Sequence, residues 1–162
     1  MRQDCLKFVN GDYFLNNEIK KDQINQTLAG FPSTIVEKLR YADTDRQGHI
    51  NNSVFSVFFE SGRVNFLYDP KNPLAEEGEQ FVVAEITVRF IKELNWPNEV
   101  IVGTAVSKMG RSSLGLTQAI FCDGVCVATA DSVIVLMDEV SRRSTALSDN
   151  TRTALQQLQI QL

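Results

Sequence analysis

The chain has 162 residues, of which 43% are hydrophobic and 22% are charged, and its formal net charge is −4. These values are typical of one globular domain, and no apolar run reaches the roughly 20 residues that cross a bilayer. An acidic chain also argues against nucleic-acid binding, because phosphate neutralisation needs a basic surface. The first residues lack the basic and apolar regions of a secretory signal. We therefore expect a cytoplasmic protein that contacts neither membranes nor nucleic acids.

The first 31 residues show no sustained hydrophobic period, and we expect residues 1–33 to form an extension of uncertain structure ahead of the domain. From Thr34 to Leu39 apolar and polar residues alternate, with β-branched side chains among them, which predicts a strand. This strand leads into a polar loop at residues 43–48.

A helix is predicted directly after this loop. Asn51 or Asn52 can cap its N-terminus, and apolar residues as far as Tyr68 cover nearly every side of the helical wheel. Such a helix must be enclosed by the rest of the fold. Gly62 in its interior costs about 1 kcal/mol relative to alanine, which indicates that another backbone segment packs closely there. The Asp-Pro pair at residues 69–70 ends the helix.

Four strands are predicted after the helix. Their segments are rich in Val, Ile, Thr and Phe and alternate in polarity: VVAEITVRFI, EVIVGTAVS, SLGLTQAIF and VCVATADSVIVLM. Turn residues at 95–98, 109–111 and 123–124 connect them, so neighbouring strands should run antiparallel. The order predicts an α+β protein in which a curved antiparallel sheet wraps around one long central helix. A short C-terminal helix should follow, capped by Ser148 or Asp149.

Cysteine usage indicates free thiols. The cysteines are Cys5, Cys122 and Cys126, an odd number without zinc-type spacing. A two-residue hairpin between Cys122 and Cys126 would place them diagonally across the strands, so we expect no disulfide between them.

Asp45 is the candidate catalytic residue. It lies just before the helix, whose first backbone N–H groups are unpaired and carry the positive end of the helix dipole. A carbonyl oxygen held there would be polarised, and an ionised aspartate beside it could attack the carbonyl carbon or activate water. The alternative is that Asp43 and Asp45 only close the loop through Asx-type hydrogen bonds.

These residues carry a family resemblance. The chain contains, in order, a strand, the motif D-T-D-x-x-G-H-I-N-N, an apolar helix with F-E-S-G-R, and four further strands. In this order and in these motifs it resembles the hotdog-fold acyl-CoA thioesterases of the 4-hydroxybenzoyl-CoA thioesterase family. Further matches are V-V-A at residues 82–84, G-R-S-S at 110–113 and the Asp-Gly hairpin before A-T-A at 128–130. The resemblance covers about residues 34–150 and implies a hotdog thioesterase domain over residues 34–162.

The resemblance also implies roles for residues around the helix start. The second aspartate of the family motif is the catalytic carboxylate, and that position is Asp45. The carbonyl-polarising donor falls at the backbone N–H of Asn52, which agrees with the argument from the helix dipole. The family commonly has tyrosine where this chain has Phe55, so that hydroxyl is absent. His49 is a further catalytic candidate, with a structural hydrogen bond as its alternative role.

The turn between the second and third of the four strands carries groups that suit coenzyme A phosphates, although a solvated loop explains them nearly as well. They are Lys108, Arg111, Ser112 and Ser113. Glu60 is a candidate substrate contact on the helix, but an ion pair with Arg63, three residues further along, is the simpler interpretation.

We expect no metal or redox cofactor, with coenzyme A entering only as part of the substrate. Asp43, Asp45 and Gln47 partly match a calcium-binding EF-hand loop. The match fails at the twelfth position, because Val54 stands where a bidentate glutamate is needed.

Hydrolysis of an acyl or aryl thioester to a free acid and coenzyme A is the expected activity, with Asp45 as general base or nucleophile. Two other functions fit the same residues. One is a hydratase or dehydratase that acts on an enoyl or hydroxyacyl thioester through Asp45 and His49, and the other is a noncatalytic acyl-CoA-binding protein. One such domain leaves a sheet edge and a helix end open, and the resemblance implies assembly through paired subunits. We therefore expect a homodimer or homotetramer with sites at the subunit interface.

Overall fold

The computed structural model describes residues 27–160, which form one antiparallel sheet, two α-helices and two short 3-10 helices. The elements are η3 (Leu28–Gly30), β1 (Ser33–Lys38), η4 (Tyr41–Asp43), α1 (Asn52–Leu67), β2 (Glu79–Phe90), β3 (Glu99–Met109), β4 (Ser113–Cys122), β5 (Val125–Asp138) and α2 (Asp149–Gln157). The strands lie in the order β1-β3-β4-β5-β2, so β1 and β2 are the two edges of the sheet.

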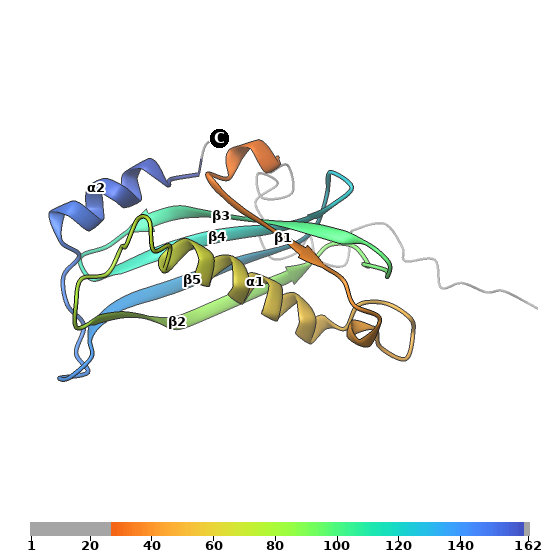
Figure 1. The fold of residues 1–162 in the computed structure, drawn as a ribbon, viewed down its shortest axis with the longest axis horizontal. Helices are drawn as coiled ribbons and strands as arrows, with labels where there is room; N and C mark the ends of the chain where they lie inside the picture. Colours follow the sequence, from red (N-terminus) through yellow and green to blue (C-terminus); the bar gives the residue numbers. More distant parts are fainter. Residues whose placement is uncertain (1–26, 161–162) are drawn as a thin grey trace, which may run out of the picture.

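Helix α1 lies along one face of the curved sheet (Figure 1). Its buried face includes Phe55, Phe58 and Phe59, which pack with strand residues such as Val102 and Ile120 in one hydrophobic cluster. Burial of these aromatic rings against the sheet is the main force that holds the helix in place. The predicted α+β architecture, with a sheet that curves around one long helix, is confirmed.

The connection between β2 and β3 differs from the sequence prediction. Residues 95–98 were expected to join neighbouring strands, but β2 pairs with β5 and lies at the opposite edge of the sheet from β1 and β3. Residues 91–98 therefore cross the end of the sheet, where they meet the loop ahead of α1. The backbone N–H of Ile50 donates to the carbonyl of Leu94 at 2.8 Å, and His49 forms a β-bridge with Asn95.

Gly62 allows a close contact between α1 and the sheet, but the contact is with side chains and not with a backbone segment as predicted. A Cβ at this position would lie 2.9 Å from Gln118 Nε2, 2.9 Å from Val102 Cγ1 and 3.0 Å from Thr104 Oγ1. The Gln118 amide donates to Thr104 Oγ1 and to the carbonyl of Phe59. A side chain at Gly62 would therefore displace a buried hydrogen-bonded group.

The expected Glu60–Arg63 ion pair is absent from the described residues. Glu60 is exposed, whereas Arg63 is buried and its guanidinium donates to Gln118 Oε1 at 3.2 Å. Burial lowers the pKa of Arg63. The three-residue spacing on the helix did not predict the partner of Arg63, because that partner, Gln118, lies on the sheet side of α1.

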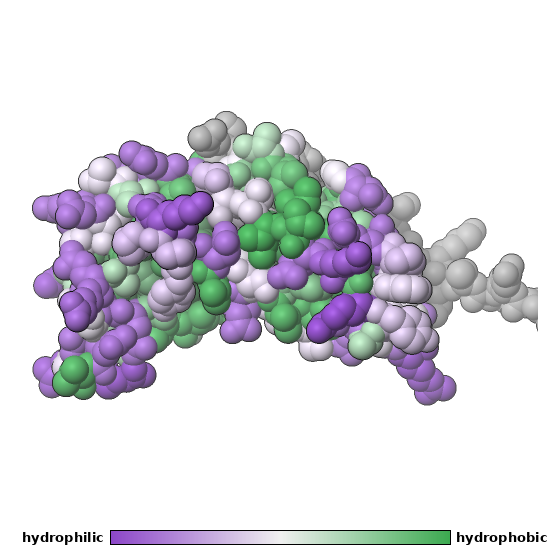
Figure 2. Space-filling model, in the orientation of Figure 1, coloured by the Kyte–Doolittle hydropathy of each residue, from purple (hydrophilic) through white to green (hydrophobic). Residues whose placement is uncertain are grey.

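One stripe of α1 is not covered by the sheet, in contrast to the predicted full enclosure. Val57, Val64 and Tyr68 are about half exposed on the helix, as are Val83 and Phe90 on β2. Strand register places both β2 residues on the same face as α1, since they pair with Ile134 and Ala128 of the core. Figure 2 shows hydrophobic surface on this side and a hollow along the lower edge, where β2 lies in Figure 1.

Other predictions concern the chain ends and the cysteines. Helix α2 begins after Ser148, whose hydroxyl accepts a hydrogen bond from the Thr151 N–H, so the predicted C-terminal helix and its cap are confirmed. Cys122 and Cys126 are free thiols, as expected.

Cys5 and most of the predicted extension lie outside the described residues. Within residues 27–160, no helix is long and apolar enough to cross a membrane.

Candidate active site

The loop between β1 and α1 is closed by its own backbone. The Asp45 N–H donates to the His49 carbonyl at 2.8 Å, and the Gly48 N–H donates to the Asp45 carbonyl at 3.1 Å. Gly48 has φ of +85°, a left-handed conformation that glycine adopts without strain. A β-bridge between Thr44 and Ile50 extends this pairing. The turn therefore holds Asp45 and His49 opposite each other at the base of the loop.

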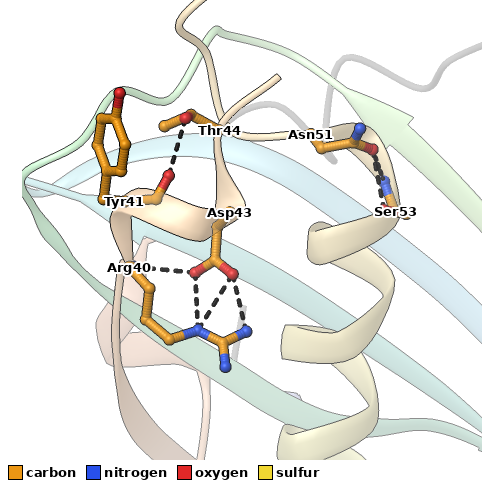
Figure 3. Close-up of polar contacts among 6 residues, drawn as sticks. All are labelled: Arg40, Tyr41, Asp43, Thr44, Asn51 and Ser53. Carbon is orange, nitrogen blue, oxygen red and sulfur yellow. Dashed lines mark hydrogen bonds and ion pairs between the residues drawn. The ribbon is translucent and has the colours of Figure 1, made fainter. Parts of the chain in front are cut away.

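Asn51 is the N-cap of α1. Its side-chain oxygen accepts from the Ser53 N–H and from the Ser53 hydroxyl, each at 2.9 Å (Figure 3). The Asn51 N–H in turn donates to the carbonyl of Asp43 at 2.9 Å, which ties the helix start to the loop. The next backbone N–H, that of Asn52, has no acceptor among residues 27–160. It is one of the unpaired donors that every helix start presents.

Asp43 is structural. Its carboxylate is buried and accepts hydrogen bonds from the backbone N–H and the guanidinium of Arg40, the shortest at 2.7 Å (Figure 3). The hydrogen bond from the Arg40 side chain lowers the pKa of Asp43 below its usual value. This carboxylate is fully engaged in holding η4 and does not line the cleft described below.

Asp45 closes the loop, which is one of the two roles that the sequence left open. Its Oδ1 accepts from the Gln47 N–H at 2.7 Å and from the His49 N–H at 3.3 Å, which is an Asx-type closure of the loop. Its Oδ2 accepts no hydrogen bond from the described residues. One oxygen thus fixes the orientation of the carboxylate, and the other remains free.

A cleft of about 380 Å³ lies at the start of α1. Its polar wall includes Asp45, His49 and Asn52, and its apolar wall includes Phe55 and Phe90. The two phenyl rings meet edge to face with centroids 5.3 Å apart. Asp45, which has a free carboxylate oxygen, and Asn52, which has an unpaired N–H, therefore line the same cleft, beside a surface that can hold an apolar group.

Residues 91–94, in the crossing connection, form another side of the cleft. Leu94 is buried beneath it, while Lys92 and Glu93 are exposed at its mouth. Glu93 Oε2 lies 3.2 Å from His49 Nε2. Sequence reasoning missed these residues, because it took the segment after β2 for part of a simple turn between neighbouring strands.

The predicted coenzyme A contacts lie far from Asp45 within one chain. They belong to the turn between β3 and β4, whereas Asp45 follows β1, whose last residue pairs with the first residue of β3. The length of β3 separates the two ends by on the order of 30 Å. Arg152 of α2 donates to the carbonyls of Gly110 and Arg111 and supports this turn. Of the described residues, those lining the cleft include neither the turn residues nor Glu60.

Comparison with known families agrees with this geometry. The model of the thioesterase-like superfamily matches residues 39–155, which span the loop, α1, strands β2 to β5 and most of α2. The chain therefore belongs to the thioesterase-like superfamily, and the resemblance to hotdog-fold thioesterases is confirmed. A comparison with curated protein sequences finds no match.

Solved structures share the fold. A predicted thioesterase from Bacillus stearothermophilus has 29% identity and a TM-score of 0.72, covering 80% of this chain and 98% of its own. A thioesterase from Thermus thermophilus, complexed with coenzyme A and Zn, has 28% identity and a TM-score of 0.70, covering 80% and 95%. DHNA-CoA thioesterase from Staphylococcus aureus has 23% identity and a TM-score of 0.68, covering 78% and 91%, and is similar in fold.

Proposed function

We propose that the protein is an acyl-CoA thioesterase that hydrolyses an acyl or aryl thioester to a free acid and coenzyme A. The proposal rests chiefly on one observation: Asp45, which has a free Oδ2, and Asn52, which has an unpaired N–H, line the same cleft. Membership of the thioesterase-like superfamily supports it, as does the similar thioesterase that was solved with coenzyme A.

In the proposed reaction, the thioester carbonyl oxygen accepts a hydrogen bond from the Asn52 N–H at the positive end of α1. Negative charge that develops on this oxygen is stabilised there, and losing one such donor typically costs about 10² to 10³ in turnover. Asp45 Oδ2 then either takes a proton from the attacking water or attacks the acyl carbon itself. In both routes the carbon–sulfur bond breaks and the thiolate leaves. In the second route the acyl group is then bound to Asp45 as a mixed anhydride, which water hydrolyses to the free acid and the aspartate.

The acyl group is assigned to the apolar part of the cleft. Phe55 and Leu94 are buried there, and the half-exposed ring of Phe90 forms its side. Burial of an acyl chain against these side chains contributes roughly 25 cal/mol per Å² of apolar surface. The thiol end of the substrate would leave through the polar mouth.

We also propose that two copies assemble through β2. This strand is long and pairs only with β5 within one chain, so its outer edge is open, and it carries exposed apolar side chains beside the exposed stripe of α1. Such an edge is a template for pairing with another strand. Two-fold pairing of β2 with β2 is antiparallel, so it brings the β3–β4 turn of one copy towards the helix start of the other. Lys108 and Arg111 would then reach the phosphates of coenzyme A bound at the opposite site.

A thiol-release assay across a panel of acyl-CoA and aryl-CoA substrates tests the proposed activity. The wild type should release thiol steadily from at least one substrate, and Asp45→Asn should reduce turnover by about 10² or more if the carboxylate performs acid–base or nucleophilic work. His49→Ala is measured alongside. A loss of less than about tenfold, or roughly 1.4 kcal/mol, would remove His49 from any central catalytic role.

The same assay separates the alternatives. Hydration of an enoyl thioester without thiol release would identify a hydratase or dehydratase, which His49 in the cleft would suit. Binding of acyl-CoA without turnover, with affinity unchanged in Asp45→Asn, would identify a noncatalytic binding protein. Either outcome would overturn the proposed hydrolysis.

A further inference from the structure

Arg152 connects α2 to the turn between β3 and β4. Its Nη2 donates to the carbonyl of Gly110 at 2.8 Å and to the carbonyl of Arg111 at 3.0 Å. The Leu147 N–H, just ahead of α2, donates to the same Arg111 carbonyl at 2.9 Å. Two consecutive carbonyl oxygens of the turn therefore face the segment that contains Arg152.

The neighbours of Arg152 on α2 anchor the helix to the rest of the fold. The buried Thr151 hydroxyl donates to the Leu74 carbonyl at 3.0 Å. Leu155, one turn after Thr151, is fully buried in a hydrophobic cluster with Val106 of β3. Because burial and a hydrogen bond fix the backbone on both sides of Arg152, its guanidinium holds the turn from a rigid support.

The direction of the two carbonyls determines the direction of two backbone N–H groups. In a trans peptide, the C=O of one residue and the N–H of the next point in opposite directions, and the peptide bonds of this turn are trans. The N–H groups of Arg111 and Ser112 therefore point away from the Arg152 side chain. Neither has an acceptor among residues 27–160. The guanidinium also polarises both peptide groups, which strengthens their N–H bonds as donors.

We propose that Arg152 is a positioning residue, which holds the β3–β4 turn so that the N–H groups of Arg111 and Ser112 donate to a phosphate of coenzyme A. Successive N–H groups in a turn form a site for anions. The exposed side chain of Arg111 adds a cation that has no ion-pair partner in the described part of the chain. The phosphate contact rests on the proposed thioesterase function, whereas the hold of Arg152 on the turn does not.

Hydrogen exchange tests the hold on the turn without any ligand. Arg152→Met and Arg152→Lys are a matched pair, because both side chains are unbranched and suit a helix, but only lysine keeps a charged donor. In Arg152→Met, the Leu147 N–H should exchange faster than in the wild type, while the Leu155 N–H inside α2 should be unchanged. Arg152→Lys should resemble the wild type, as should Gln156→Ala, which alters an exposed residue of α2. Unchanged exchange at Leu147 in Arg152→Met, or equal acceleration at Leu155, would overturn the hold on the turn.

Calorimetric titration with coenzyme A tests the phosphate contact. Arg152→Met should bind coenzyme A about tenfold more weakly than the wild type, because a turn that is not preorganised must be ordered on binding. Arg152→Lys should recover most of this loss, and Gln156→Ala should show none. In turnover, Arg152→Met should raise KM for an acyl-CoA with little change in kcat, and it should not affect the corresponding acyl-pantetheine, which has no phosphate.

The outcomes separate this inference from the proposed function. Equal affinity for coenzyme A in the wild type and in Arg152→Met would overturn the phosphate contact. A loss of the same size with acyl-pantetheine would also overturn it, because the defect would then not concern the phosphates. A wild type that does not bind coenzyme A would instead contradict the proposed function itself.

Discussion

Asp43 and Asp45 are two residues apart, but their carboxylates differ in burial and in hydrogen-bond partners. The first is buried against Arg40, and the second keeps one oxygen free and lines the same cleft as Asn52. The difference arises because η4 turns the Asp43 side chain towards Arg40, whereas Asp45 starts the tight turn that ends at His49. A structural carboxylate and a candidate catalytic carboxylate therefore share one motif.

The ion pair of Asp43 predicts an acid-sensitive contribution to stability. Its pKa is lowered in the folded state, so the contribution is present above the unfolded value of about 3.9 and is lost as pH falls through the folded value. Asp43→Asn should destabilise the protein at neutral pH, because Arg40 loses its charged acceptor, although the exposure of Arg40 screens part of this effect. The difference between variant and wild type should shrink below about pH 4.

Urea unfolding across a pH series measures this effect, with the exposed Asp123→Asn as the control. A difference between wild type and Asp43→Asn that does not vary with pH would show that the charge of Asp43 is not what stabilises the loop.

Among single residues, the sequence located those whose structural neighbours are also close along the chain. Asp45 and Asn52 could be placed at a helix start because the motif and the helix are contiguous. Glu93 could not be assigned, since its contact with His49 depends on a connection that crosses the sheet. Arg63 was assigned to Glu60 by helical spacing, but Gln118, which is distant in sequence, is its partner.

Among the elements, α1 carries the site and depends on a close fit to the sheet. Gly62→Ala should be destabilising although alanine favours helices. The added Cβ would meet Gln118, Val102 and Thr104 at 2.9–3.0 Å, and such overpacking costs roughly 1–3 kcal/mol against a gain in helix propensity of about 1 kcal/mol. Ser61→Ala gains helix propensity next to the same site without entering this contact.

Thermal unfolding of both variants separates the two effects. We expect a lower Tm for Gly62→Ala and an unchanged or higher Tm for Ser61→Ala. A Gly62→Ala variant as stable as Ser61→Ala would mean that the sheet accommodates a side chain there.

Local sequence patterns predicted the types and approximate bounds of the helices and strands. They did not predict the order of the strands in the sheet. Alternating polarity identified β2 to β5, and turn residues identified the ends of the strands. Which strands pair depends on burial against α1, which local sequence does not encode. The position of β2 beside β5 therefore emerged only from the structure, and with it the wall of the cleft formed by residues 91–94.

For the whole molecule, the exposed edge predicts a specific assembly. Val83→Lys places a charge on the α1 side of β2 and should convert the proposed dimer to a monomer, because an unpaired charge in an apolar interface is costly. Val36→Lys is the matched control, since Val36 is also an exposed valine but lies on β1, at the other edge.

Light scattering coupled to size-exclusion chromatography gives the mass of each variant. We expect a dimer or larger assembly for the wild type and for Val36→Lys, and a monomer with weakened coenzyme A binding for Val83→Lys. A monomeric wild type that turns over substrate would contradict assembly through β2 as a requirement of the site.

The free carboxylate oxygen of Asp45 is the group on which the proposed chemistry depends, and it is probed best by turnover and coenzyme A affinity measured on the same Asp45→Asn protein. Asparagine keeps an oxygen for the loop hydrogen bonds but cannot act as a base or as an effective nucleophile, so the cleft should survive without its chemistry. We predict a fall in kcat of about 10² or more, with coenzyme A affinity within about threefold of wild type. Turnover that stays within about tenfold of wild type would show that another group performs the reaction.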